Sequence, residues 1–106
     1  MILGMGVDIL EVGRMERALK QAGFKEKTFT RDEIEYCESK GAHSSESYAA
    51  RFAAKEALGK ALGTGLTPGQ LQQVEVLNEE KTGAPQLHLM GQLRVAALVR
   101  AWNGSM

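Results

Sequence analysis

The sequence is poor in several features that mark particular classes of protein. Its single cysteine, Cys37, cannot form an internal disulfide, has no partner spacing for zinc and is expected to be a core residue. Lys+Arg and Asp+Glu each number 13, so the excess positive charge on which a general nucleic-acid binder depends is missing. No apolar run approaches the ~18 residues of a membrane span, and the N-terminus lacks the basic flank of a signal peptide. These absences predict a cytoplasmic protein.

The composition that remains is that of one globular domain covering residues 1–106, with 43% hydrophobic and 25% charged residues. Thr30 and Glu33 form a capping box that opens a helix. Apolar periodicity predicts strands over 2–10, 74–78 and 86–89, and helices over 11–22, 30–41, 47–62 and 92–102. Because these elements do not alternate regularly, they favour an α+β fold, with a small antiparallel sheet packed by helices on one face.

The charges of residues 51–60 call for an explanation. One carboxylate, Glu56, stands among Arg51, Lys55 and Lys60 in an otherwise small and apolar helix. At ~100° per residue, Glu56 lies nearly opposite a face of small residues that is expected to pack on the sheet. That face consists of Ala50, Ala54, Ala57, Leu58 and Ala61. A solvated face with a Glu56–Lys60 ion pair, worth ~0.2–0.5 kcal/mol, explains the charges. A site for a metal ion and a phosphate-rich ligand explains them as well, and spacing leaves both open.

Three further residues weigh toward a ligand site. Phe52 falls on the polar side of its helix, which predicts that a ligand or another subunit covers it. Gly59 costs ~1 kcal/mol against alanine in mid-helix, which predicts a close backbone approach. Asp8 lies on the glycine-bearing face of the predicted first strand, where open space allows another group to approach. Asp8 and Glu56 together could hold Mg²⁺, and the neighbouring cations could bind phosphates.

Taken together with several other segments, these residues resemble holo-[acyl-carrier-protein] synthase, a family of 4′-phosphopantetheinyl transferases. The likeness extends in order over nearly the whole chain, and the combination of segments is specific although each alone is weak. The segments are Gly4-Met5-Gly6-Val7-Asp8-Ile9-Leu10-Glu11, Arg14-Met15-Glu16, Phe29 to Cys37, Arg51-Phe52-Ala53-Ala54-Lys55-Glu56-Ala57, Val74 to Asn78 and Gly83-Ala84-Pro85.

The resemblance implies an activity. The expected enzyme transfers 4′-phosphopantetheine from coenzyme A to a serine of apo acyl carrier protein, releases adenosine 3′,5′-bisphosphate and serves fatty-acid biosynthesis. It implies Mg²⁺ held by Asp8, Glu56 and the coenzyme A diphosphate, and a homotrimer with active sites between neighbouring subunits. Lys60 is the candidate for stabilising the leaving phosphate, with the Glu56–Lys60 ion pair as its alternative. The general base is unassigned, and Glu56 acting through a metal-bound water is one possibility.

The same resemblance assigns binding residues. Arg51 and Lys55 are expected to contact coenzyme A phosphates or a neighbouring subunit, and Gly83 with Pro85 to line the coenzyme A site. Arg14 is the expected docking residue for the acidic carrier protein. Met15 beside it is expected to make apolar contact with the carrier or to pack in the core.

The C-terminus departs from the family pattern. The family continues past its final helix into a further strand or hairpin with a Ser-x-Ser-His stretch, whereas this sequence ends at Asn103-Gly104-Ser105-Met106. A C-terminally short chain would leave an open sheet edge and an incomplete subunit interface. The alternative function is therefore a truncated, non-catalytic module that binds the carrier protein.

Overall fold

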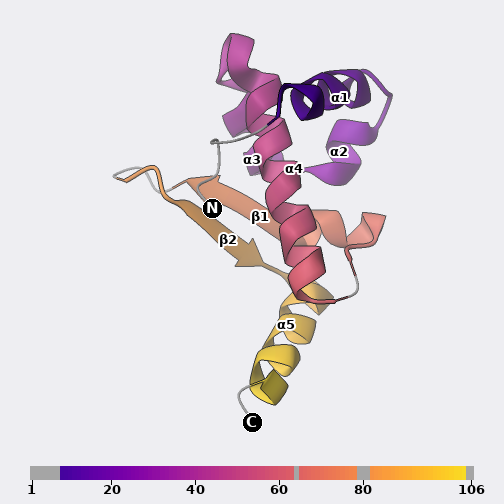
Figure 1. Cartoon of the computed structure of the whole chain (residues 1–106), viewed down its shortest axis with the longest axis vertical. Coiled ribbons are helices and arrows are strands. Elements are labelled where there is room, and N and C mark those ends of the chain that lie inside the picture. Colours follow the sequence, from indigo (N-terminus) through magenta and orange to yellow (C-terminus); the bar gives the residue numbers. More distant parts are fainter. Residues whose placement is uncertain (1–7, 64, 79–81, 105–106) are drawn as a thin grey trace.

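The computed structural model describes residues 8–63, 65–78 and 82–104. The central element is the long helix α4, around whose first half the shorter N-terminal helices gather (Figure 1). The elements are α1 (Ile9–Leu19), α2 (Phe24–Thr28), α3 (Arg31–Glu38), η1 (Gly41–His43), α4 (Ser44–Ala61), η2 (Pro68–Gln73), β1 (Val74–Asn78), β2 (Pro85–Leu89) and α5 (Gly91–Gly104). The arrangement confirms the predicted α+β class.

The N-terminal prediction needs correction. Residues 9 and 10, expected at the end of a strand, form the first turn of α1. The physical reason is Asp8, whose carboxylate accepts a hydrogen bond of 2.9 Å from the Leu10 amide and so caps the helix. Residues 2–7 of the expected strand lie outside the described residues. The helix α2 follows at Phe24 and was not predicted, because five residues are too few to show helical periodicity.

In the middle of the chain the observed elements agree closely with those predicted from the local sequence. The capping box of Thr30 and Glu33 is present at the start of α3. The strand β1 has the predicted bounds, and β2 begins one residue earlier than predicted, at Pro85. The two strands pair antiparallel, with Val76 opposite Leu87. Within the described residues the sheet has these two strands only.

The core consists of two clusters that α4 bridges. The first lies among α1, α3 and the start of α4, and the second lies between α4, the sheet and α5. The buried members are Met15, Phe29, Cys37, Tyr48 and Ala49 in the first cluster and Ala54, Val74, Val76 and Leu93 in the second. None of the helices in the described part of the chain is apolar over a length that would traverse a bilayer.

The buried face of α4 differs from the predicted one. Ala57 and Ala61, expected against the sheet, are exposed, whereas Arg51, Lys55 and Gly59 are buried. The helix is therefore rotated about its own axis relative to the prediction, so that the edge with Arg51 and Lys55 faces the core. This is possible because neighbouring elements offer a carboxylate and backbone carbonyls that satisfy the buried cations, which would otherwise be costly to desolvate.

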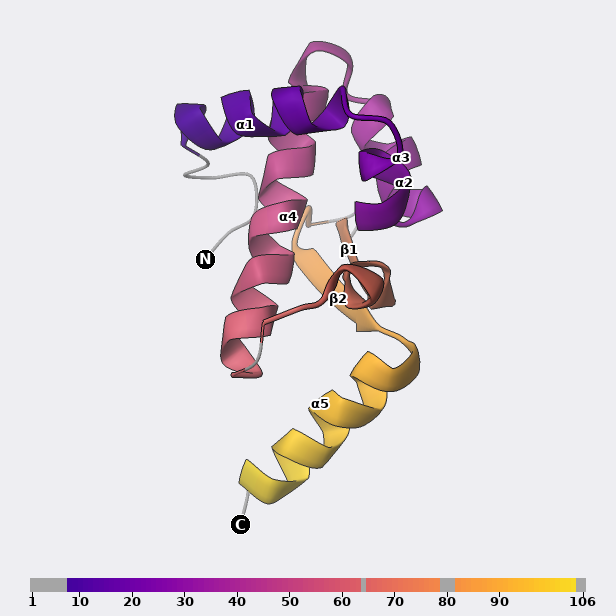
Figure 2. The same cartoon turned by 90° about the vertical axis from the view of Figure 1, so that its right-hand side faces the viewer.

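The last helix stands apart from the other elements. Both views show α5 projecting beyond the sheet from the end of β2 (Figures 1 and 2). Leu93 near its start is the buried contact to the second cluster, at 1% exposure. Val95, Leu98 and Val99 are more than half exposed, at 56%, 61% and 54%. An apolar helix face of this kind is typical of a surface that another chain or segment covers.

Candidate active site

The exposed face of α4 carries Glu56 and Lys60. Both are exposed, as predicted, and they lie one turn apart on the helix. The i,i+4 ion pair that the sequence allowed between them is not formed in the described structure, and neither side chain has another partner there. The ion pair that was the alternative explanation is therefore absent from the described structure, and both charges are accessible to solvent.

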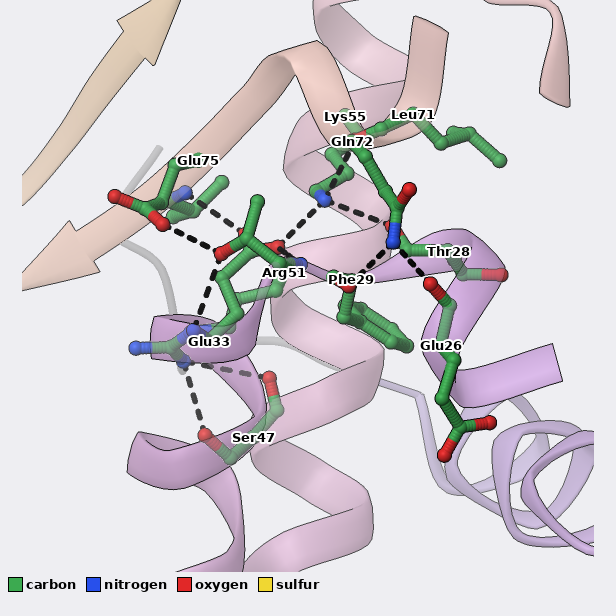
Figure 3. Close-up of polar contacts among 12 residues, drawn as sticks. Glu26, Thr28, Phe29, Glu33, Ser47, Arg51, Lys55, Leu71, Gln72 and Glu75 are labelled. Atoms are coloured by element: carbon green, nitrogen blue, oxygen red, sulfur yellow. Dashed lines mark hydrogen bonds and ion pairs between the residues drawn. The ribbon is translucent and has the colours of Figure 1, made fainter. Parts of the chain in front are cut away.

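The buried face of α4 carries a complete ion pair (Figure 3). Lys55 and Glu33 are both 0% exposed, and Lys55 Nζ lies 2.6 Å from Glu33 Oε1. Lys55 also donates to the carbonyls of Thr28, at 2.9 Å, and Leu71, at 2.8 Å. The three donors of the ammonium group are therefore used inside the fold.

Glu33 is equally well satisfied. Its Oε1 accepts from the Thr30 amide at 2.8 Å, and its Oε2 accepts from the Val76 amide at 2.8 Å. Burial lowers the pKa of Lys55, and the adjacent Glu33 carboxylate acts in the opposite direction. We assign the pair as ionised, because five hydrogen bonds converge on it and the charged forms match their directions.

Arg51 lies one turn before Lys55 and is 3% exposed. Its guanidinium donates to Ser47 Oγ at 2.9 Å and to Asn78 Oδ1 at 2.6 Å, and it stacks 4.1 Å from the centroid of the Tyr36 ring. Asn78 in turn donates to the carbonyl of Gly83 at 2.9 Å. Arg51 thus connects α4 to the end of β1 and, through Asn78, to the turn before β2.

These contacts correct two sequence-based assignments. Lys55 and Arg51 were expected at coenzyme A phosphates or at a neighbouring subunit, but both side chains are buried and directed at partners within this chain. Lys55 Nζ has no hydrogen left to donate, and only Nε of Arg51 lacks a partner among the described buried side-chain atoms. We therefore assign both residues to the fold that holds the site.

The predicted close approach at Gly59 is confirmed. A Cβ at this position would lie 2.9 Å from the Leu66 backbone nitrogen and 3.0 Å from Gly65 Cα, closer than real Cβ atoms come. The Gly65 amide also donates to the Gly59 carbonyl at 3.0 Å. The approaching group is therefore the chain that returns after α4, and glycine is required because any side chain would push this segment away.

The two residues of α1 that were predicted to bind the carrier protein differ in their exposure to solvent. The side chain of Arg14 is 70% exposed and pairs with Glu11 at 3.1 Å, so it remains accessible to a partner. Met15 is 5% exposed and belongs to the first core cluster, which agrees with the packing role of its two expected roles. Phe52, expected under a ligand or another subunit, is half-buried against the same cluster.

The proposed coenzyme A residues of the hairpin lie at its turn. Gly83 is exposed, with φ of 72°, and a Cβ there would meet nothing within 4 Å. Pro85 is the first residue of β2 and is half-buried. The open space at Gly83 allows a flat or charged group to approach the backbone.

The two expected metal ligands come from helices that pack against each other, α1 and α4. Asp8 is exposed, and within the described residues only its Oδ1 has a partner, the Leu10 amide that it caps. Glu56 is exposed and unpaired in the described structure. No group of three or more His, Cys, Asp or Glu side chains clusters as a metal site in the described ranges. Two carboxylates would suit Mg²⁺ only if substrate oxygens and water completed its shell.

Cys37 takes no part in this surface. It is buried in the first cluster, and its thiol donates to Ser47 Oγ at 3.2 Å. Burial raises the pKa of Cys37, which keeps the thiol protonated and unreactive. The predicted core role of Cys37 is confirmed.

Comparison with known proteins shows the family to which this chain belongs. Residues 4–103 match the 4′-phosphopantetheinyl transferase superfamily, so the chain belongs to this family. A protein from Treponema denticola named holo-[acyl-carrier-protein] synthase is 50% identical over 91 residues, covering 86% of this chain and 73% of the relative. Proteins of the same name from Cytophaga hutchinsonii and Ruminiclostridium cellulolyticum are 52% and 47% identical, covering 80% and 85% of this chain and 67% and 69% of those relatives. The predicted family is confirmed.

Proposed function

We propose that this chain transfers the 4′-phosphopantetheinyl group of coenzyme A to a serine of apo acyl carrier protein, releasing adenosine 3′,5′-bisphosphate. The observation that carries the proposal is the exposed, unpaired Glu56–Lys60 surface of α4 in a chain of this superfamily. A carboxylate and an ammonium group with no partner among the described residues are suited to a metal–diphosphate ligand. The proposed setting is the cytoplasm, in fatty-acid biosynthesis.

The proposed division of labour follows the charge of each residue. Asp8 and Glu56 would hold Mg²⁺, which neutralises phosphate charge and polarises the reacting phosphorus when it is bound. Lys60, one turn beyond Glu56, places a positive charge beside the same ligand and stabilises the bisphosphate as it leaves. Gly83 and Pro85 would contact coenzyme A at the hairpin turn, where the backbone is accessible.

Docking of the carrier protein is proposed on α1. Arg14 is the exposed cation there, and an acidic carrier would compete with Glu11 for its guanidinium. Charge complementarity of this kind guides encounter and orientation more than it adds affinity.

The transfer itself is tested by mass spectrometry of the carrier. Incubation of the chain with coenzyme A, Mg²⁺ and apo carrier protein is expected to add one phosphopantetheinyl group to the carrier. Chelation of the metal is expected to stop the reaction, and added Mg²⁺ to restore it. If a curated relative modifies the same carrier while this chain does not, the proposal fails. Carrier binding without transfer would instead identify a non-catalytic module.

We also propose that the chain assembles as a homotrimer with its active sites between subunits. The exposed apolar face of α5 supports self-association, and its occupant would be a second copy of this chain. Leu98→Glu is expected to convert the assembly to monomers, because burying a carboxylate against the neighbour is unfavourable. Light scattering after size exclusion measures the mass. The control is Gln92→Glu, an exposed substitution on the same helix, and a monomeric parent chain would contradict the proposal.

A further inference from the structure

The buried Glu33–Lys55 pair joins five elements at one point (Figure 3). Lys55 of α4 contacts Glu33 of α3, the carbonyl of Thr28 at the end of α2, and the carbonyl of Leu71 in η2. Glu33 continues the connection to β1 through the Val76 amide. Every one of these contacts is directional, since a hydrogen bond weakens steeply when its donor turns away.

Stability alone does not account for such a pair. Taking two charges out of water is costly, and replacing a buried ion pair by apolar side chains of similar volume is often neutral or stabilising. A buried pair does, however, favour one arrangement of its elements over near alternatives, because other arrangements leave a charge unpaired. The contribution of the Glu33–Lys55 pair is therefore expected to lie in the position that it gives to α4.

Beyond Tyr48 near its start, which is buried and donates to Glu38, α4 has mostly small apolar side chains along the stretch that carries Glu56 and Lys60. Much of α4 between Ala49 and Ala61 is alanine or glycine, so its apolar contacts are small. Apolar burial is also non-directional, and a smooth helix surface can turn with little loss of contact. Lys55 and Arg51 are the long side chains that reach from this part of α4 into fixed polar partners.

Lys55 is covalently adjacent to Glu56, which places their Cα atoms ~3.8 Å apart and their side chains ~100° apart around the axis. With Lys55 held from three directions, Glu56 must point away from the core, and so must Lys60. A change in the roll of α4 would turn both groups with it.

We infer that the Glu33–Lys55 pair is a positioning pair for the transfer reaction: it sets the roll of α4 and thereby the placement of Glu56 and Lys60. The inference rests on the proposed function for its kinetic consequence. Lys55 and Glu33 are buried and are not proposed to touch substrate or metal; they act through the helix that presents the reacting groups.

The test compares transfer per folded molecule, because the variants are expected to differ in stability. Lys55→Met removes the pair, and Glu33→Asp keeps the charge but shortens the side chain, so that it cannot reach Lys55 and the Val76 amide together. The control is Ile34→Ala, which removes apolar contact next to Glu33 and leaves the pair intact. Transfer is measured per folded molecule, with the folded fraction taken from circular dichroism in the same buffer.

We expect both pair variants to lose about tenfold or more in kcat and to need more Mg²⁺ for half-maximal rate, which is the size of effect seen for groups that orient metal ligands. Ile34→Ala is expected to keep the parent values. Hydrogen exchange provides a readout independent of transfer: relative to the rest of the chain, amides of residues 56–61 are expected to exchange faster in the pair variants than in the control.

Equal transfer per folded molecule in all three variants, with equal exchange over residues 56–61, would overturn the inference and leave the pair a structural contact. If Lys55→Met does not fold, the Glu33→Asp comparison decides. If the parent chain does not transfer at all, the proposed function fails, and the exchange comparison alone decides whether the pair positions α4.

Discussion

Glu56→Gln is expected to lower the rate of phosphopantetheinyl transfer by about 100-fold or more, because a bound metal contributes several kcal/mol to the transition state and each ~1.4 kcal/mol changes the rate tenfold. Glutamine has nearly the shape of glutamate but no charge, and it is a poorer ligand for Mg²⁺. Glu56 is exposed and unpaired in the described structure, so its replacement is expected to change the free energy of unfolding by less than ~0.5 kcal/mol. Mass analysis of the carrier protein measures the transfer.

The matched control is Glu46→Gln, which neutralises an exposed carboxylate in the first turn of the same helix. It is expected to transfer at the parent rate. Urea unfolding of both variants checks that the fold is intact. A Glu56→Gln enzyme with parent activity at low Mg²⁺ would show that this carboxylate does not hold the metal, and the assignment of Asp8 would then lose its partner.

Lys55→Met is expected to have the largest effect on stability, lowering the free energy of unfolding by about 3–5 kcal/mol. Methionine fits the volume of the lysine stem but removes the positive charge, which leaves the Glu33 carboxylate buried with an unpaired charge. The carbonyls of Thr28 and Leu71 lose their donor at the same time. The loss is therefore larger than that of an apolar contact of similar size.

Chemical denaturation monitored by circular dichroism measures this loss. Lys60→Met makes the same change one turn and a half along the helix, at an exposed position, and is expected to shift the unfolding free energy by less than ~0.5 kcal/mol. Equal midpoints for the two variants would contradict the buried pair. The contrast isolates burial, since residue type and helix are the same in both substitutions.

Local signals in the sequence were sufficient for most of the fold. The capping box at Thr30, the turn residues before Pro85 and the apolar alternation of β1 each depend on neighbours along the chain, and the structure has these elements close to the predicted bounds. The first helix was misplaced because Asp8 served as an N-cap, where alternation of apolar residues had indicated a strand. Short-range periodicity cannot distinguish a helix capped by Asp8 from a strand over the same residues.

The charged face of α4 required the tertiary structure. From spacing, Lys55 and Lys60 were both plausible phosphate ligands, since each is a lysine near Glu56 on one helix. Packing separates them, because α3 and η2 enclose Lys55 and leave Lys60 in solvent. The capping box singled out Glu33 but gave no sign that its second role is to hold a lysine 22 residues away.

The sequence by itself determined the family, the outward position of Glu56 and the need for glycine at position 59, because these follow from ordered motifs and from local geometry. Only the tertiary structure decided which cations belong to the fold. Lys55 and Arg51 find acceptors in segments distant along the chain, whereas Lys60 and Arg14 remain accessible. The physical reason is that the cost of burying a charge depends on partners that long-range packing alone brings together.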